Sequence, residues 1–273
     1  MKEDWRHTHP PGRSLRGVGF LILLILLAAQ PVRAQETGTN TRPDPQAPAV
    51  FDPQAKSAQW RHSAAGRFLR DVWIDQKTIW TAPVRMNRRE FFAIVLPLTA
   101  ATAALIATDE RAGKWLPNTP DQIRWSGRVS TIGAVYTLGG LVGAGMIVGR
   151  AANKPNMLRM GRLSAEAFAN VVIVGGAIKG LTSRERPDQN DGQGRFWKGG
   201  SSFPSGHAMN AWAVATAVAR SPKCPRILAL VSYGAATTVS LSRWGAHRHF
   251  PSDILVGSVF GALIGNYVAT RPR

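Results

Sequence analysis

From residue 90 onward the chain is dominated by long apolar stretches that are rich in Ala, Gly and Leu and show no alternation of polar and apolar residues. Alternation is expected of half-buried strands, whereas these lengths suit helices. Pro204-Ser205 and Pro251-Ser252 are typical of helix starts, and Ser164 ahead of Glu166 indicates another. The pattern therefore predicts an all-α fold with six helices. They are expected at residues 91–108, 129–149, 163–181, 206–219, 226–241 and 252–269.

The first 34 residues have the form of a secretory signal peptide. A basic region that ends at Arg16 precedes an apolar run over residues 17–29, and Val32-Arg33-Ala34 offers a cleavage site before Gln35. The run is shorter than the roughly 20 residues that a membrane-spanning helix needs. Residues 1–34 are therefore predicted to direct export to the cell envelope.

Residues 35–89 are interpreted as a segment that precedes the functional domain. Pro, Thr and Gln predominate over residues 35–57, a composition typical of a disordered tether. Residues 58–89 place Trp and other large apolar residues between several Arg and Lys. This amphipathic basic segment is expected either to lie on a membrane surface or to pack against the domain that follows. The functional domain is then expected over residues 90–273.

Two interpretations of the helices stay open. Several are long enough to cross a bilayer, but the mean hydropathy of −0.10 is low for a protein with six spans. The basic clusters at 85–89 and 150–162 are typical of cytoplasmic loops, whereas a cleaved signal would place the chain in the opposite orientation. Either the helices form a soluble or peripherally attached periplasmic bundle, or the chain is membrane-embedded with its site facing the periplasm and the N-terminal run is not a translocating signal.

The net charge of +18 favours an anionic partner, either a nucleic acid, an anionic lipid surface or a phosphorylated substrate. The basic residues are scattered between apolar stretches with no nucleic-acid recognition motif, which argues against nucleic acid. Cys224 is the single cysteine, so an intramolecular disulfide and a cysteine metal cluster are both excluded.

Three groups of reactive residues follow one another in the last hundred residues of the chain. A phosphoryl group carries negative charge on three oxygens, so a protein that transfers it needs fixed cations around them. Lys179, Arg186 and Arg243 would supply these cations, each at or beyond the end of a predicted helix. Arg suits this task because its planar fork binds two oxygens at once.

The second group, Pro204-Ser205-Gly206-His207, opens a predicted helix. Free backbone N–H groups and the helix dipole attract an anion at such a start. Ser205 is expected to cap the helix and to donate its hydroxyl to a phosphate oxygen, and Gly206 lets the backbone approach closely. His207 is placed to protonate the departing ester oxygen.

The third group pairs a nucleophile with the residue that orients it. His249 precedes a predicted helix, and Asp253 lies in the first turn of that helix. The Asp253 carboxylate can therefore reach one ring nitrogen of His249, which leaves the other nitrogen free to attack phosphorus.

In order and spacing, these groups resemble the three-part signature of the type 2 phosphatidic acid phosphatase and vanadium haloperoxidase superfamily. The matching patterns are Lys-x6-Arg-Pro, Pro-Ser-Gly-His and Ser-Arg-x5-His-x3-Asp, over residues 179–253, and the helical layout matches over about residues 90–273. The resemblance implies a six-helix core, His249 as the phosphorylated nucleophile and His207 as the general acid. It implies no metal and no other cofactor for the phosphatase members.

The function expected is that of an exported, metal-independent phosphatase that acts on phosphate monoesters or diphosphates, above all those of lipids. A vanadate-dependent haloperoxidase and a soluble acid phosphatase for small esters remain alternatives within the superfamily. A metal hydrolase that uses His247 is disfavoured, because three cations around the site would repel a divalent ion. A non-catalytic lipid-binding protein is disfavoured because His207, His249 and Asp253 are all present.

Substrate selection is assigned to two segments without a recognisable motif, residues 109–128 and 188–203. Within the second, the Gly-rich run 192–200 with Phe196 and Trp197 is interpreted either as a flexible lid or as an ordinary turn-rich loop. The sequence makes no prediction of the oligomeric state.

Overall fold

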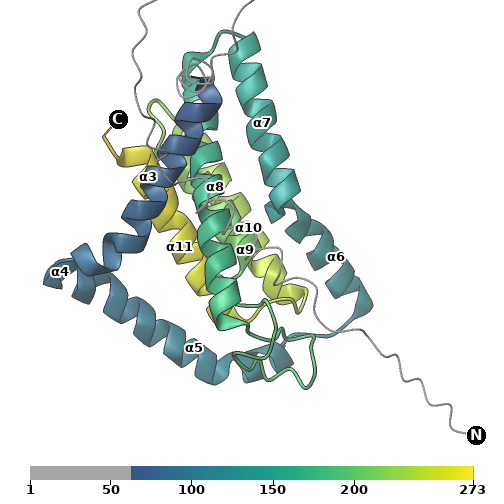
Figure 1. The fold of residues 1–273 in the computed structure, drawn as a ribbon. Coiled ribbons are helices and arrows are strands. Elements are labelled where there is room, and N and C mark those ends of the chain that lie inside the picture. Colours follow the sequence, from purple (N-terminus) through teal and green to yellow (C-terminus); the bar gives the residue numbers. More distant parts are fainter. Residues whose placement is uncertain (1–62, 273) are drawn as a thin grey trace, which may run out of the picture. The chain divides into compact units, whose positions relative to one another are not determined.

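A computed structural model describes residues 63–272 and shows the all-α fold that the sequence predicts (Figure 1). The predicted signal peptide, the tether and residues 58–62 lie outside the described residues. Within the described range no β-strand is present. The helices are α3 (Ala64–Arg85), α4 (Arg88–Glu90), α5 (Leu96–Trp115), α6 (Pro120–Ser130), α7 (Val135–Ala151), α8 (Pro155–Thr182), α9 (Gly206–Ala219), α10 (Arg226–Gly245) and α11 (Pro251–Thr270). A π-helical segment, Phe91–Val95, joins α4 to α5, and a short 3-10 turn, Thr131–Gly133, separates α6 from α7.

The six expected helices are present as α5, α7, α8, α9, α10 and α11, but three details of the expectation were wrong. The helix expected at residues 129–149 is interrupted by the 3-10 turn and the extended Ala134, so α7 begins only at Val135. Helix α8 begins at Pro155, so Ser164 lies inside the helix and does not start it. Proline is favoured in the first turn because its missing N–H has no helical partner there. Residues 109–128, expected to be loop, contain the end of α5 and most of α6. Helix α6 forms because Thr119 accepts a hydrogen bond from the Gln122 N–H and Pro120 follows it.

The amphipathic basic segment forms α3, which packs against α8. The Gln76 side chain donates to the Asn170 side-chain oxygen at 2.7 Å, and Asn170 donates to Asp75 at 2.8 Å. Near the C-terminal end of the described chain, Arg271 pairs with both Asp75 and Glu166. These partly buried polar contacts hold α3 to the bundle, which agrees with the second of its two expected placements.

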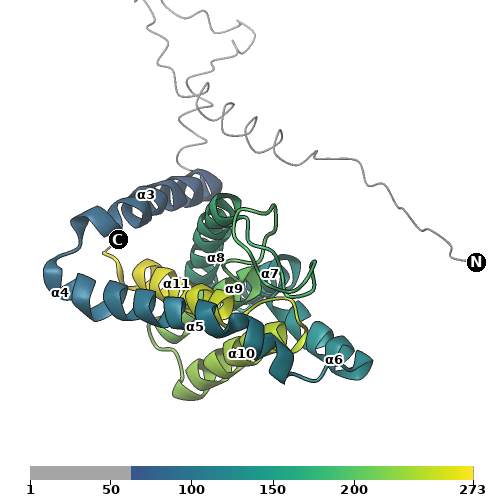
Figure 2. The same cartoon turned by 90° about the horizontal axis from the view of Figure 1, so that it is seen from below.

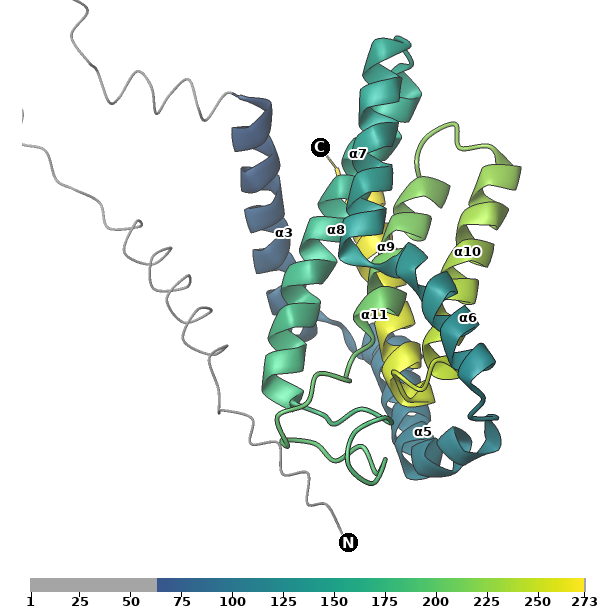
Figure 3. The same cartoon turned by 90° about the vertical axis from the view of Figure 1, so that its right-hand side faces the viewer.

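Helix α9 lies at the centre of the bundle, in contact with α8, α10 and α11 (Figures 1 and 3). Its buried side chains are mostly Ala, and together with Met209 they pack with Val171 of α8 and Ile264 of α11. Small side chains let neighbouring helices approach closely, because little separates their backbones. The core is therefore built around a central helix with mostly small side chains.

Three glycines at four-residue spacing on α11 bring that helix against the backbone of α9. A Cβ added at Gly257, Gly261 or Gly265 would lie 2.6, 2.3 or 2.4 Å from a backbone oxygen of α9 or its cap. For Gly257 that oxygen belongs to Ser205, the first residue before α9. The glycines therefore fix how α9 and α11 face each other, and with it the relative position of the two helix starts.

Three described helical segments are long and apolar enough to cross a membrane: Arg88–Trp115, Pro155–Thr182 and Pro251–Thr270. A fourth is obtained if α6 and α7, bent by 43°, form one span. The apolar part of Arg88–Trp115 has none of its residues buried, although α5 contacts α11 (Figure 2). An apolar helix left exposed in this way suits lipid surroundings better than water. The structure thus favours the membrane-embedded interpretation over the soluble bundle.

Replacing Gly261 with Ala is expected to destabilise the folded protein by about 1–3 kcal/mol, because the new Cβ would overpack against the Met209 carbonyl oxygen. Thermal unfolding of the purified protein in detergent measures the change. Gly234→Ala in α10 is the matched control, since no described residue outside the backbone of α10 lies within 4 Å of a Cβ added there. Ala there should gain roughly 0.5–1 kcal/mol of helix stability. Equal unfolding temperatures for the two variants would rule out the close backbone contact.

Candidate active site

The end of α8, the end of α10 and the starts of α9 and α11 lie at one end of the bundle (Figure 1), and the predicted residues lie in or next to these helix ends. Lys179 lies in the last turn of α8 and Arg243 in the last turn of α10. His207 lies in the first turn of α9 and Asp253 in the first turn of α11. The two helix N-termini add their partial positive charge to the cationic side chains. The folded chain thus gathers residues that are far apart in sequence into one cationic site.

A pocket of about 330 Å³ opens at this end of the bundle. Three of the predicted residues, Arg186, His207 and Arg243, line it together with Arg248, which the sequence analysis did not identify. Arg248 pairs with Asp188 at 2.6 Å. The other lining residues are Ile123, Gly127, Ser130, Thr131 and Ala246. Helix α6, which the sequence analysis did not foresee, therefore forms one wall of the site.

The three predicted phosphate-binding cations are hydrogen-bonded to neutral oxygens and form no ion pair within the described part of the chain. The Lys179 Nζ donates to the carbonyl oxygens of Ser201 and Pro204, both at 2.6 Å. Arg186 donates to the Ser201 hydroxyl at 3.0 Å. Arg243 donates to the Ser130 hydroxyl at 2.9 Å. Their positive charges are positioned by these contacts but stay available to an anion.

Ser205 occupies the N-cap position of α9, as expected, but its hydroxyl does not make the capping hydrogen bond. Its backbone N–H donates to the Asp253 carbonyl at 2.9 Å, which ties the start of α9 to the start of α11. The hydroxyl is buried and has no hydrogen-bond partner among the described residues. A buried polar group without a partner is costly, and a bound anion would satisfy it.

Gly206 follows Ser205 as the first residue of α9. A Cβ at this position would lie 3.5 Å from the Lys179 Cε, which is an ordinary van der Waals contact. The protein itself would therefore accommodate a larger residue here. The expected role of Gly206, a close approach of backbone to phosphate, remains a prediction.

His207 is surrounded by positive charge. Its pKa is lowered from 6.5 to about 3, first by burial and then by Arg243, His249, Lys179 and Arg186. The side chain is therefore neutral at physiological pH when no anion is bound. Because part of the shift comes from neighbouring cations, a bound anion would raise the pKa of His207 again.

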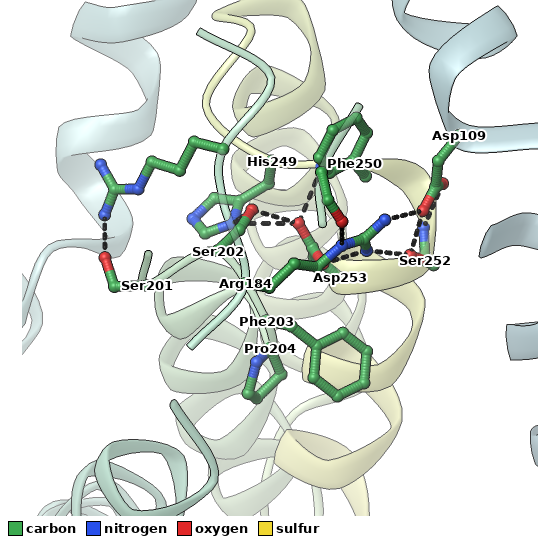
Figure 4. Close-up of polar contacts among 12 residues, drawn as sticks. Asp109, Arg184, Ser201, Ser202, Phe203, Pro204, His249, Phe250, Ser252 and Asp253 are labelled. Carbon is green, nitrogen blue, oxygen red and sulfur yellow. Dashed lines mark hydrogen bonds and ion pairs between the residues drawn. The ribbon is translucent and has the colours of Figure 1, made fainter. Parts of the chain in front are cut away.

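His249 is buried, with 2% of its side chain exposed, and its Nδ1 lies 3.6 Å from the Asp253 Oδ2 and 3.5 Å from the Ser202 hydroxyl (Figure 4). The same carboxylate oxygen accepts hydrogen bonds from the Ser202 hydroxyl at 2.5 Å and from the Phe250 N–H at 2.9 Å. Burial lowers the pKa of His249 to about 4 despite the opposing effect of Asp253. These partners assign the proton to Nδ1 and leave Nε2 with a free lone pair.

Sequence reasoning missed Arg184, which lies two residues before Arg186. Arg184 is buried and pairs with both Asp253 and Asp109 (Figure 4). Asp109 belongs to the segment that was expected to select the substrate; instead its carboxylate is enclosed at the end of α5. The only sequence signal was a second arginine close to Arg186-Pro187.

The Gly-rich segment forms turns that are tied back to the end of α8. The Trp197 N–H donates to the Thr182 carbonyl at 2.9 Å, and the Gly200 N–H donates to the Ser183 carbonyl at 3.0 Å. A Cβ at Gly200 would lie 2.0 Å from the Arg184 carbonyl oxygen, so this glycine permits a close backbone contact. The structure therefore shows the turn-rich loop of the two expected alternatives.

His247 lies in the turn after α10, where its Nε2 is 3.3 Å from the Pro117 carbonyl oxygen. Among residues 63–272, no group of three His, Cys, Asp or Glu side chains is arranged to hold a metal ion. The site as built offers cations and neutral imidazoles, a donor set suited to an oxyanion.

The chain is similar to known proteins in a family model and in solved structures. The model of the PAP2 superfamily matches residues 162–272. A transmembrane PAP2-type phosphatidylglycerolphosphate phosphatase from Bacillus subtilis is similar in structure, with a TM-score of 0.50 and 26% sequence identity over 66% of this chain and 92% of that chain. LpxE from Aquifex aeolicus matches with a TM-score of 0.44 and 19% identity over 56% of this chain and 87% of its own. No curated protein sequence matches the chain.

Residues 162–272 thus form a PAP2-superfamily region, and the family resemblance drawn from the three motifs is confirmed. The helical fold class and the prediction of a phosphatase are confirmed with it. Membrane association, which was one of two open interpretations, is supported by the apolar helices together with the similarity to a transmembrane protein.

Proposed function

We propose that this chain is a membrane-embedded phosphatase that removes phosphate from phosphorylated lipids through a phosphohistidine formed on His249. The observation that carries the proposal is the environment of His249: a buried neutral imidazole, oriented by Asp253, is acted on by Lys179 and Arg243, which form no ion pair with any described residue. The buried, unpartnered hydroxyl of Ser205 adds a hydrogen-bond donor to the same site. This combination fits a tetrahedral oxyanion that is attacked by nitrogen.

In the first step, Lys179, Arg186 and Arg243 bind the phosphoryl oxygens, and Ser205 and the backbone at the start of α9 donate hydrogen bonds. The Nε2 of His249 attacks phosphorus. An N–P bond forms as the bond between phosphorus and the ester oxygen breaks. The Nδ1 proton of His249 faces the Asp253 carboxylate, which stabilises the positive charge that develops on the ring.

His207 supplies the proton for the leaving group. The bound phosphoryl group offsets the cations that lower the pKa of His207, so the imidazole takes up a proton when substrate binds. It then gives this proton to the departing oxygen. In the second step the neutral imidazole removes a proton from water, which attacks the phosphohistidine and releases inorganic phosphate.

A lipid substrate is supported by the surroundings of the site and by one comparison. The apolar part of Arg88–Trp115 is exposed along its length, and its C-terminal end lies next to the catalytic residues through Asp109. The structurally similar Bacillus subtilis protein is a transmembrane phosphatidylglycerolphosphate phosphatase. A site at the end of lipid-exposed helices can take the head group of a lipid whose tails stay in the bilayer.

Purified protein is expected to release phosphate from phosphatidic acid faster than from a soluble aryl phosphate, with EDTA present and with inhibition by vanadate. The reaction needs no metal because its cations are Lys and Arg, and vanadate mimics the phosphoryl group. Phosphate release measured on both substrates side by side provides the test. His249→Ala should abolish release from both, since it removes the nucleophile.

His207→Ala should slow release from the lipid more than from the aryl phosphate, because a good leaving group departs without a proton. Equal losses for the two substrates would contradict the acid role of His207. If phosphate is not released and vanadate instead confers halide oxidation with peroxide, the phosphatase proposal fails and the alternative function, a vanadate-dependent haloperoxidase, replaces it.

We further propose that the site faces the non-cytoplasmic side of the membrane. The basic turn around Arg150 and Arg159 lies at the opposite end of α8 from Lys179, about 40 Å away for a helix of this length. Basic turns of this kind stay in the cytoplasm. This orientation requires that the apolar run at 17–29 is not a cleaved, translocating signal, which is the second interpretation of the N-terminus.

Cys224 provides a test of this orientation, because it is the single cysteine and lies in the turn between α9 and α10, away from the site. A membrane-impermeant maleimide is expected to leave Cys224 unlabelled in intact cells and to label it after lysis and denaturation. A Cys224→Ser, Gln193→Cys variant, with its cysteine in the site-side loop, should be labelled in intact cells. The reverse pattern would refute the proposed orientation.

A further inference from the structure

Arg184 is a buried cation that the proposed reaction does not use. Only 1% of its side chain is exposed, although it belongs to the loop after α8. Its guanidinium carbon lies 4.7 Å from the centre of the Phe196 ring and 4.4 Å from the centre of the Phe250 ring. A charge enclosed in this way is destabilising unless it is paired and hydrogen-bonded.

All three nitrogens of the guanidinium are bonded (Figure 4). The Nε donates to the Gly194 carbonyl at 2.9 Å. The Nη1 donates to the Asp253 Oδ1 and to the Ser252 hydroxyl, both at 2.7 Å, and the Nη2 donates to the Asp109 Oδ2 at 2.8 Å. Because the guanidinium is planar, these contacts fix its orientation as well as its position.

The two oxygens of Asp253 have different partners. One is held by Arg184, and the other faces His249 and accepts from the Ser202 hydroxyl and the Phe250 N–H. The rotation of the carboxylate is therefore set from the side opposite to the nucleophile. If the contact with Arg184 were lost, the oxygen that faces His249 would lose its fixed direction.

Asp109 shares the same guanidinium with Asp253, so one positive charge serves two buried carboxylates. Asp109 is held in place by Ser252, which donates to it through both its backbone N–H and its hydroxyl. Asp109 lies on α5, the lipid-exposed helix, whereas Asp253 lies on α11. How strongly the Arg184 charge acts on Asp253 therefore depends on where α5 places Asp109.

We propose that Arg184 is a positioning residue for the nucleophile. It orients Asp253 and weakens the attraction of that carboxylate for the His249 proton. Asp109 of α5 modulates this effect because it shares the guanidinium. The role within a reaction rests on the proposed function; the electrostatic link to His249 does not. The charged and titratable groups that surround His249 are Asp253 on α11, Lys179 on α8, His207 on α9, Arg243 on α10, Arg184 in the loop and, behind it, Asp109 on α5.

The test measures the titration of the His249 imidazole by NMR in detergent. It compares variants of Arg184 with variants of Asp109, the second carboxylate that Arg184 contacts. Arg184→Met leaves the Asp253 charge uncompensated, so the pKa of His249 should rise from about 4 towards 6.5. Asp109→Asn removes the carboxylate that shares Arg184, so the pKa of His249 should fall. A residue that only fills space would shift neither titration, or would shift both in the same direction; either result would overturn the proposal.

Kinetics on the same variants add a second readout. Arg184→Met should lower kcat on the order of 10²-fold with little change in KM, because the nucleophile is misplaced while the phosphate-binding cations are untouched. Arg184→Lys keeps the charge but lacks the fork, so it should lower kcat while leaving the His249 titration near its original position. A rise in KM with kcat unchanged would contradict a positioning role.

Arg195→Met is the matched control, since Arg195 lies in the same loop and pairs with Glu185 but is 44% exposed. It should change neither the titration nor kcat. If Arg184→Met does not fold, the isosteric Asp109→Asn and the charge-conserving Arg184→Lys still decide the proposal. Failure of the wild-type protein to release phosphate would overturn the proposed function alone, because the opposite shifts of the His249 titration are measured without turnover.

Discussion

The catalytic arrangement depends on the close contact between α9 and α11. Gly257, Gly261 and Gly265 let the two helices meet backbone to backbone, and the first of them lies against the Ser205 carbonyl. At that point the Ser205 N–H also bonds to the Asp253 carbonyl at 2.9 Å. The start of the helix that presents Ser205 and His207 is therefore joined directly to the start of the helix that presents Asp253. A Cβ at Gly257 would push apart the start of α9 and the start of α11, where Ser205 meets Asp253.

Electrostatics give the site its chemical character. Cations that form no ion pair with the described residues lie near two imidazoles. Burial and those cations lower the pKa of His207 to about 3 and the pKa of His249 to about 4. Both histidines are neutral before an anion arrives. In the proposed reaction, a bound anion raises the pKa of His207 again, and Asp253 orients His249 for attack. In the proposed mechanism, one set of charges both binds the phosphoryl group and distinguishes the acid from the nucleophile.

Six of the helices could be predicted from the sequence because their apolar composition is a local pattern. The position of the eight signature residues at or near helix ends could be predicted for the same reason, whereas their chemical roles stay predictions. Helix α6 was missed because its cap, Thr119-Pro120, lies in a polar stretch, and the start of α8 was missed because Arg159 and Arg162 interrupt the apolar pattern. The Arg184–Asp109 pair could not be predicted, since its members are 75 residues apart and meet only in the folded chain. The unsatisfied Ser205 hydroxyl is likewise a property of packing and not of residue type.

Phosphorylation of His249 can be tested directly by trapping the enzyme during a single turnover. Protein is mixed rapidly with a lipid phosphate that carries a labelled phosphoryl group, quenched in alkali, where an N–P bond survives, and digested for peptide mapping. The label is expected on His249, and it should appear and decay as inorganic phosphate is released. Label on another residue, or no labelled protein at any time during a complete turnover, would contradict it.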